Sequence, residues 1–218
     1  MTALLQPVLE RPAQADAQGL VVLLHGVGSN EQSLAPLAAA IDPRLHVLLP
    51  RGPLPIAAQG FGWFNVRFGA QGPVIDPAQA EAARVQVGEW LVVQQQRLGL
   101  DARQTVLAGF SQGGIISASV ALTQPQRVKS FAILSGRILP EVAAHIPPDV
   151  GAAGLHALLL HGHADEKLPY ALAEAAAQRL QALGVAHQLR GYAVGHTLSV
   201  DMQRDFLDWI GQRLLSLP

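Results

Sequence analysis

The sequence contains no cysteine, and only 14% of its 218 residues are charged. The lack of cysteine excludes disulfide bonds, thiolate metal sites and cysteine nucleophiles. The 15 basic and 16 acidic residues nearly balance and are scattered along the chain, a distribution that does not favour nucleic-acid binding. Residues 1–12 lack a basic segment followed by a continuous apolar run, so we expect no signal peptide.

Long hydrophobic runs are also missing. Runs such as Leu20–Leu24 and Ala157–Leu160 are far too short to cross a bilayer. We therefore expect a cytoplasmic protein with no stable membrane insertion. Half of the residues are nevertheless hydrophobic, which is enough to form a large core, and a chain of this length predicts a single domain over residues 1–218.

Short apolar segments of strand length alternate with longer segments of helical period. We expect strands at residues 20–24, 45–49, 105–108, 128–134, 155–160 and 186–192. We expect helices at residues 31–41, 77–98, 113–123, 168–183 and 198–215. This alternation predicts an α/β fold, with a mostly parallel central sheet and helices on both faces.

The helix expected at residues 77–98 has a clear start, because Asp76 can cap it and Pro77 suits the first turn. Its apolar pattern suggests one shared face, made of Ala78, Ala82, Val85, Trp90 and Val93.

Two segments, residues 51–75 and 136–154, are too long for simple connections, and long loops in compact domains are usually functional. The first contains an aromatic cluster that includes Trp63 and Phe64. These aromatic side chains either line a pocket or cover an edge of the sheet. No segment between the expected elements reads as a large inserted lid.

The sequence Gly109-Phe110-Ser111-Gln112-Gly113 matches the G-x-S-x-G pattern of a nucleophile elbow. The pattern alone is weak evidence, but here an expected strand enters it and an expected helix leaves it. This strand–turn–helix setting exposes the serine hydroxyl and directs the N–H groups of the helix N-terminus toward a developing oxyanion. Ser111 is therefore the candidate nucleophile, and the alternative is an ordinary glycine-rich turn.

A serine nucleophile needs a base and a group that orients the base. Asp165 and His196 follow in the order Ser, Asp, His, and each comes after an expected strand. His187 lies within a strand and is better read as structural. Other possible acids exist: Asp149, Asp201, Asp205 and Asp208.

A rival interpretation uses the His161-x-His163-x-Asp165 spacing, which resembles part of a binuclear metal-hydrolase motif. No further His or carboxylate cluster at ligand spacing accompanies it, and it leaves the serine motif unexplained. We therefore expect no metal and no cofactor.

An oxyanion hole in such a site uses two backbone N–H groups. One belongs to the residue after the nucleophile, here Gln112. The other comes from an early strand–helix loop, and His25-Gly26-Val27-Gly28 provides one, with Val27 as the candidate donor.

Several of these motifs together resemble the phospholipase/carboxylesterase family of the α/β-hydrolase superfamily, which includes acyl-protein thioesterases and bacterial carboxylesterases. The resemblance rests on six segments in the family's order, spread over nearly the whole chain: His25–Gly28, Trp63-Phe64, Gly109–Gly114, Leu134–Pro140, His161–Pro169 and Gly195-His196. It implies the α/β-hydrolase fold, with the triad of Ser111, Asp165 and His196. It also implies that Trp63, Phe64 and Leu139 border the acyl site.

Two positions depart from the family pattern. Asn65 stands where the family often has Asp after the aromatic pair, and Glu166-Lys167-Leu168 replaces a more apolar run. Both departures bear on which substrate the protein accepts, and neither bears on the identity of the triad.

The function that follows is a serine carboxylesterase acting on small, short-acyl esters through an acyl-serine intermediate. The alternative is a lysophospholipase or an acyl-protein thioesterase acting on long acyl chains. A catalytically inactive binding module is a third reading, which the intact Ser, Asp and His set disfavours. The expected partner is a small-molecule ester, without nucleic acid, and a homodimer is left open.

Overall fold

The computed structural model describes residues 5–6, 8–69 and 72–215. Residues 1–4, on which part of the signal-peptide prediction depends, lie outside the described residues. No helix in the described part of the chain is long and apolar enough to span a membrane.

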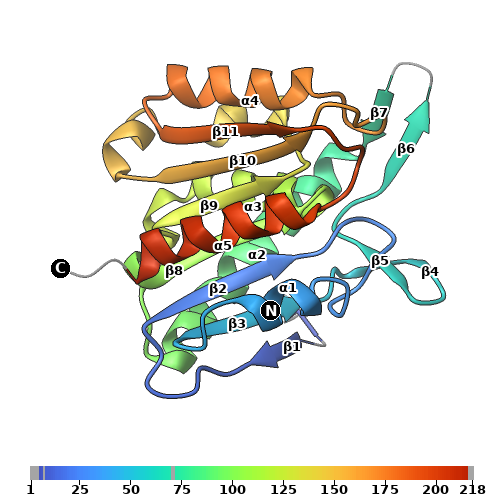
Figure 1. The fold of residues 1–218 in the computed structure, drawn as a ribbon. Helices are drawn as coiled ribbons and strands as arrows, with labels where there is room; N and C mark the ends of the chain where they lie inside the picture. Colours follow the sequence, from blue (N-terminus) through green and yellow to red (C-terminus); the bar gives the residue numbers. More distant parts are fainter. Residues whose placement is uncertain (1–4, 7, 70–71, 216–218) are drawn as a thin grey trace.

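A seven-stranded sheet forms the centre of the molecule, in the order β1-β3-β2-β8-β9-β10-β11 (Figure 1). Its strands are β1 (Val8–Arg11), β2 (Gly19–Leu24), β3 (Leu45–Pro50), β8 (Thr105–Phe110), β9 (Ser130–Leu134), β10 (His156–Gly162) and β11 (Ala186–Tyr192). Only β1 is antiparallel to its neighbour, and the other pairs are parallel. The expectation of a mostly parallel sheet is confirmed, and β1 is an edge strand that the sequence analysis missed.

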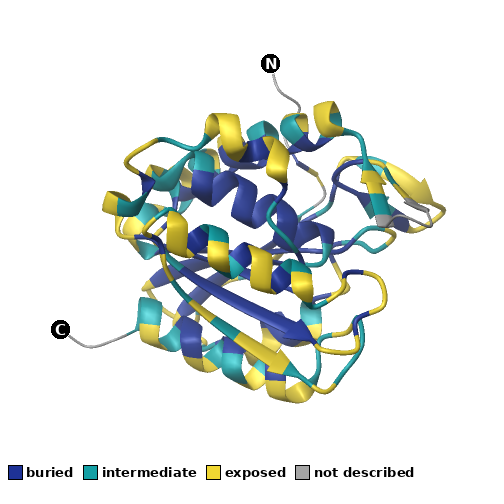
Figure 2. Cartoon of the chain, turned by 90° about the horizontal axis from the view of Figure 1, so that it is seen from above, coloured by how far each residue is buried: buried dark blue, intermediate teal, exposed yellow. Residues whose placement is uncertain are grey.

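Helices cover both faces of the sheet, because the side chains of the central strands are apolar on both faces. On one face, α2 (Pro77–Leu98), α3 (Gln112–Thr123) and α4 (Ala171–Ala182) pack over alternate residues of the strands, such as Leu107 and Leu159. On the other face, α1 (Ala35–Ala40) and α5 (Val200–Leu214) cover residues such as Val106 and Leu158. Figure 1 shows α1 and α5 in front of the sheet, and Figure 2 shows buried residues through the central layers with exposed residues on the outer helices.

The long segment after β3 forms two small hairpins, one of β4 (Leu54–Ala57) with β5 (Gly60–Gly62) and one of β6 (Val66–Gly69) with β7 (Gly72–Ile75). The segment after β9 contains two short 3₁₀ helices, η3 (Pro140–His145) and η4 (Val150–Ala153). Two further 3₁₀ turns are η1 (Ala102–Gln104) and η2 (Pro125–Arg127). Neither long segment forms a large helical lid, which agrees with the prediction.

The first helix starts later than expected, whereas α2 has its expected bounds. The first helix begins at Ala35 and not at Glu31, because the Asn30 side chain accepts the N–H of Gln32 and holds the preceding residues in a turn. Helix α2 has the expected bounds, and Asp76 caps it by accepting from two backbone N–H groups.

The buried face of α2 agrees only in part with the expected one: Trp90 is buried, but Ala78 and Ala82 are exposed and Val93 is 44% exposed. The helix instead buries a mixed set of residues: Ala80, Ala83, Arg84, Val87, Gly88, Trp90, Leu91 and Gln95.

Candidate active site

Ser111 occupies a sharp turn between β8 and α3. Its backbone has φ 53° and ψ −114°, a conformation that residues other than glycine rarely adopt. The turn is fixed from outside, because the Ser111 N–H donates to the carbonyl of Leu134 on β9 at 2.8 Å. It also needs glycine at Gly113, where a Cβ atom would overlap the Leu24 carbonyl. A strained residue held by its surroundings in this way is typical of a functional site.

His196 lies between Ser111 and Asp165 and contacts both. Its Nε2 is 2.9 Å from Ser111 Oγ, and its Nδ1 is 2.6 Å from Asp165 Oδ2. A carboxylate only accepts, so Nδ1 carries the proton and Nε2 is free to accept the serine hydroxyl proton. The three residues predicted as a triad, which are 85 and 31 positions apart in sequence, therefore form one chain of hydrogen bonds.

Asp165 is buried, being only 4% exposed, and its carboxylate is fully engaged. Oδ1 accepts the backbone N–H groups of Lys167, at 2.9 Å, and Leu168, at 2.8 Å. His161 Nε2 donates to the Leu168 carbonyl at 2.7 Å and lies 3.3 Å from Asp165 Oδ2. Burial is the main cause that lowers the pKa of His161 below its usual range. His161 is therefore a neutral side chain, and its bond to the Leu168 carbonyl holds the segment whose N–H groups bind Asp165.

The two backbone N–H groups predicted for the oxyanion hole have no acceptor among the described residues. Gln112 begins α3, so its N–H has no acceptor within the helix. Val27 follows β2, and its N–H has no hydrogen-bond acceptor among the described residues. The neighbouring N–H of Gly28 is used elsewhere, because it donates to the Phe61 carbonyl at 2.8 Å. Both predicted donors line the smaller pocket together with Ser111, and Val27 also lines the larger one.

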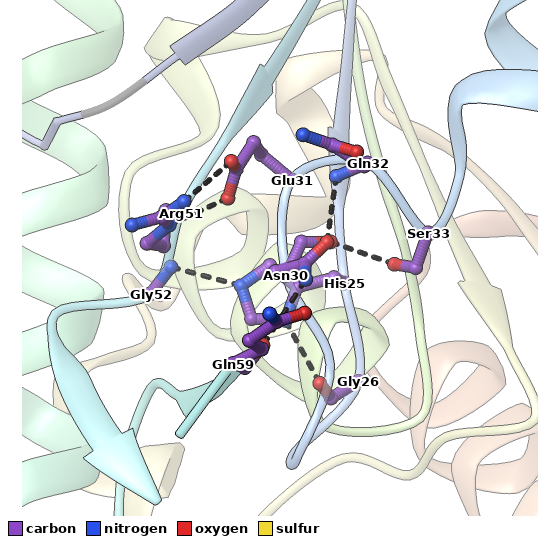
Figure 3. A network of polar contacts seen from close by, with 9 residues as sticks. All are labelled: His25, Gly26, Asn30, Glu31, Gln32, Ser33, Arg51, Gly52 and Gln59. Atoms are coloured by element: carbon purple, nitrogen blue, oxygen red, sulfur yellow. Dashed lines mark hydrogen bonds and ion pairs between the residues drawn. The ribbon is translucent and has the colours of Figure 1, made fainter. Parts of the chain in front are cut away.

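The loop that carries Val27 is held by a network of polar contacts (Figure 3). The N–H of Gly52 donates to His25 Nε2 at 2.9 Å, so His25 Nδ1 carries the proton and donates to the Gly26 carbonyl at 2.8 Å. Burial, the largest cause, lowers the pKa of His25. Arg51 forms two hydrogen bonds of 2.6 Å to the buried Glu31, and this bidentate pair ties the loop to the chain after β3.

The side chain of Gln112 joins the nucleophile turn to the aromatic segment. Its Oε1 accepts the Trp63 N–H at 2.7 Å, and its Nε2 donates to the Phe64 carbonyl at 2.7 Å. The Trp63 indole in turn donates to the His25 carbonyl at 2.9 Å. Gln112 therefore fixes the position of residues 63–64 relative to Ser111.

Two pockets meet at Ser111, Val27 and His196. The larger pocket has a volume of about 490 Å³, and its apolar wall comes from Leu34, Pro36, Leu37, Phe110 and Leu198. The smaller pocket has a volume of only about 30 Å³. Its apolar wall comes from Phe64, Val66, Pro73, Ile75 and Ile115. The site therefore offers a narrow space on one side of the serine and a wide one on the other.

The three residues expected to border the acyl site take different positions. Phe64 lines the smaller pocket, as expected. Trp63 is 1% exposed and lines neither pocket, and its ring contacts His25 instead. Leu139 is also 1% exposed; it directly precedes η3 and lines a separate depression beside α2. The position of Leu139 therefore does not support the expected role at the acyl site.

Three residues considered in the sequence as alternative metal ligands or acids make contacts away from the triad. His163 is exposed and its ring packs against Tyr170, 4.1 Å between centroids, so it does not join His161 in a ligand set. Within the described residues, no group of three or more His, Asp or Glu side chains is arranged to hold a metal ion. Asp205 accepts from Tyr192 and pairs with Arg190, and Asp201 pairs with Arg204.

Several site residues were missed by sequence reasoning. Arg137 lines the smaller pocket, and Lys167 lines both pockets. The sequence singled out Lys167 only as part of a departure from the family pattern, and it gave Arg137 no signal beyond its place in the segment after an expected strand. The Arg51–Glu31 pair had no signal, because its partners are 20 positions apart in segments without a recognisable motif.

The parallel sheet, the strained serine turn and the hydrogen-bonded Ser, His and Asp define an α/β-hydrolase. A family model described as Phospholipase/Carboxylesterase matches residues 6–213, and the chain belongs to this family. It is accordingly an enzyme, a hydrolase of the carboxylesterase type.

Solved structures agree with this assignment. Esterase PE8 is 28% identical, with a TM-score of 0.82 over 95% of this chain and 98% of that one. A carboxylesterase from Mesorhizobium loti is 25% identical, with a TM-score of 0.82 over 97% of each chain. Acyl-protein thioesterase 2 of Zea mays is 18% identical, with a TM-score of 0.77 over 95% of this chain and 99% of that one, and this likeness shows the fold alone.

Proposed function

We propose that the chain is a serine carboxylesterase that hydrolyses small, short-acyl carboxylic esters. The observation that carries this proposal is the hydrogen-bonded line from Asp165 through His196 to Ser111, at the junction of the two pockets. A serine hydroxyl next to the unprotonated Nε2 of a histidine, with backbone N–H groups beside it, suits acyl transfer.

The proposed mechanism has two stages. His196 Nε2 takes the proton as Ser111 Oγ attacks the ester carbonyl, while Asp165 stabilises the resulting imidazolium. The N–H groups of Val27 and Gln112 bind the oxyanion. The C–O bond to the alcohol then breaks, and the alcohol leaves with the proton from His196. In the second stage His196 takes a proton from a water molecule as the water attacks the acyl carbon; the bond to Ser111 Oγ then breaks, the proton returns from His196 to Ser111, and the acid is released.

The preference for short acyl chains is argued from the smaller pocket. Phe64 and Ile115 help to enclose it, and its volume of about 30 Å³ leaves little space for a long chain. Each additional methylene adds about 0.8 kcal/mol of binding only where a wall exists to bury it. The larger pocket, which also reaches Ser111, is assigned to the alcohol.

In the second candidate function, the larger pocket receives the acyl chain and the smaller one does not. The larger pocket has apolar residues such as Leu34, Leu37 and Leu198 and a volume of about 490 Å³, enough to receive part of a long acyl chain. In that case the enzyme would act on lysophospholipids or on acylated proteins.

A series of 4-nitrophenyl esters from two to sixteen carbons separates the two functions. The short-acyl proposal expects kcat/KM to be highest at about two to six carbons, since further methylenes find no wall. Phe64→Ala should move the optimum to longer chains, whereas Leu139→Ala, outside both pockets, should not move it. A wild-type kcat/KM that rises steadily to twelve or more carbons would establish the long-chain function instead.

A cytoplasmic location remains a prediction from the sequence, and a homodimer is left open by the sequence. Cell fractionation tests the first, and light scattering coupled to size-exclusion chromatography tests the second.

A further inference from the structure

The smaller pocket has an apolar wall, and two cationic residues, Arg137 and Lys167, line it as well. Arg137 lines this pocket together with Phe64 and Ile115, within the same cavity as Ser111. A neutral short acyl chain would require only apolar contacts here. A cation at this position therefore has no role in the mechanism described above.

Arg137 is held at the site by a rigid connection. It follows β9 through Ser135, whose φ of 50° is unusual for a residue other than glycine, and through Gly136. A Cβ atom on Gly136 would lie 2.9 Å from the Ser111 carbonyl oxygen, so the loop runs directly against the nucleophile turn. The N–H of Ser135 donates to the Leu160 carbonyl at 2.8 Å and fixes the loop to β10. The arginine is thus positioned by the same backbone that positions the nucleophile.

The guanidinium of Arg137 is half-buried and incompletely bonded. Its Nε is buried without a hydrogen-bond partner, and no carboxylate of the described residues forms an ion pair with it. Burial lowers the pKa of Arg137, and the negative charge of Glu141 raises it by a smaller amount. A guanidinium nevertheless stays protonated in proteins, so a half-buried charge without an ion-pair partner among the described residues lines the pocket. An anion from a ligand would relieve this cost.

The surroundings favour an anion rather than a cation. Lys167 lines both pockets, and none of the described residues lining either pocket is Asp or Glu. The nearby Asp165 is already bonded to His196 and to two backbone N–H groups. Two positive side chains therefore face the space beside Ser111 without a free counter-charge.

We propose that Arg137 binds a carboxylate at the far end of a short acyl chain, so that the preferred substrates are hemiesters of short dicarboxylic acids. The inference rests on the proposed esterase function and adds the substrate class. Hydrolysis follows the two stages given above: the ester C–O bond breaks, Ser111 carries the acyl group, and water releases a dicarboxylate. Arg137 contacts only the remote carboxylate and takes no part in proton transfer.

Two ethyl esters of equal acyl length test the proposal, because both release ethanol and can be followed by the same coupled assay. Monoethyl glutarate carries the remote carboxylate, and ethyl pentanoate lacks it. The wild type should have at least about tenfold higher kcat/KM for monoethyl glutarate, as expected for a hydrogen-bonded charge pair. Arg137→Gln should lower this ratio by about 10- to 100-fold, and Arg137→Lys should lower it less.

Controls separate the remote charge from general effects. Arg103→Gln removes the same charge from an exposed position on η1 and should leave the ratio unchanged. Lys167→Gln should lower the ratio by only a few-fold, since its exposed charge is screened by water. If Arg137→Gln does not fold, Arg137→Lys takes its place: it keeps the charge but loses the planar guanidinium, so it should still lower the ratio, and an unchanged ratio would overturn the proposal.

The outcomes distinguish this inference from the function on which it rests. Hydrolysis of ethyl pentanoate with a ratio of one or less, or a ratio unaffected by Arg137→Gln, would overturn the inference and leave the esterase function intact. Failure of the wild type to hydrolyse either ester would overturn both.

Discussion

The hydrogen bonds of Gln112 give a prediction that can be worked out from the structure. Gln112→Ala removes the acceptor of the Trp63 N–H and the donor to the Phe64 carbonyl, both at 2.7 Å and both buried. Each buried backbone group left unpaired costs about 1–3 kcal/mol, so the two together should lower the free energy of unfolding by about 2–6 kcal/mol. This is a large part of the stability of a typical domain.

Urea denaturation followed by tryptophan fluorescence measures this loss. Gln112→Met keeps most of the side-chain volume, so it should retain most of the destabilisation if the hydrogen bonds are its cause. Gln79→Ala is the matched control, because Gln79 Oε1 also accepts a backbone N–H of this segment, from Asn65 at 2.8 Å, but at an exposed position. It should cost less than about 1 kcal/mol, since water replaces the glutamine. The reasoning is refuted if Gln112→Ala costs no more than Gln79→Ala, or if Gln112→Met restores wild-type stability.

Three further predictions follow from the site. Gly113→Ala should destabilise the fold by about 3 kcal/mol or more, because its Cβ atom would overlap the Leu24 carbonyl; an unchanged melting temperature would contradict that close approach. Burial lowers the pKa of His25 and His161, so the unfolded chain binds more protons below pH ~6.5 and stability should fall as the pH drops from about 7 to 5. Urea denaturation at each pH checks this, and His161→Gln should make the fall shallower, whereas an identical slope would argue against a neutral His161. Esterase activity should be indifferent to EDTA, since the proposed nucleophile forms by proton transfer; loss on chelation with recovery on adding zinc would revive a metal mechanism.

The fold could be predicted from the sequence where local patterns agree with burial. The continuous apolar runs at β2, β8 and β10 identified buried parallel strands. Helix α2 was predicted with its observed bounds, with Asp76 and Pro77 marking its start; in the structure Gly99 ends it in a left-handed conformation. The candidate triad could also be predicted, since chain order and strand ends together restrict the choice of acid and base.

The remaining features depend on contacts that local patterns do not encode. The face of α2 was wrong because the helix buries Arg84 and Gln95, which bond to side chains and to a carbonyl, while alanines occupy both sides. The hairpins after β3 lie in a segment rich in glycine and proline, where alternation of apolar residues is weak. The hydrogen bond from the Trp63 N–H to the Gln112 side chain joins residues 49 positions apart, and no spacing rule predicts such a bond.

The most direct test of the central claim is the covalent chemistry of Ser111. Wild-type protein should react with a fluorophosphonate probe, and mass spectrometry should locate the adduct on Ser111. Ser111→Ala should abolish labelling and lower kcat for a short ester by about 10⁴- to 10⁶-fold, with unchanged thermal stability. Ser119→Ala is the control, since this serine of α3 bonds only within its helix and should keep both labelling and activity. A Ser111→Ala protein that retains more than a few per cent of wild-type activity would contradict the assignment of Ser111 as the nucleophile.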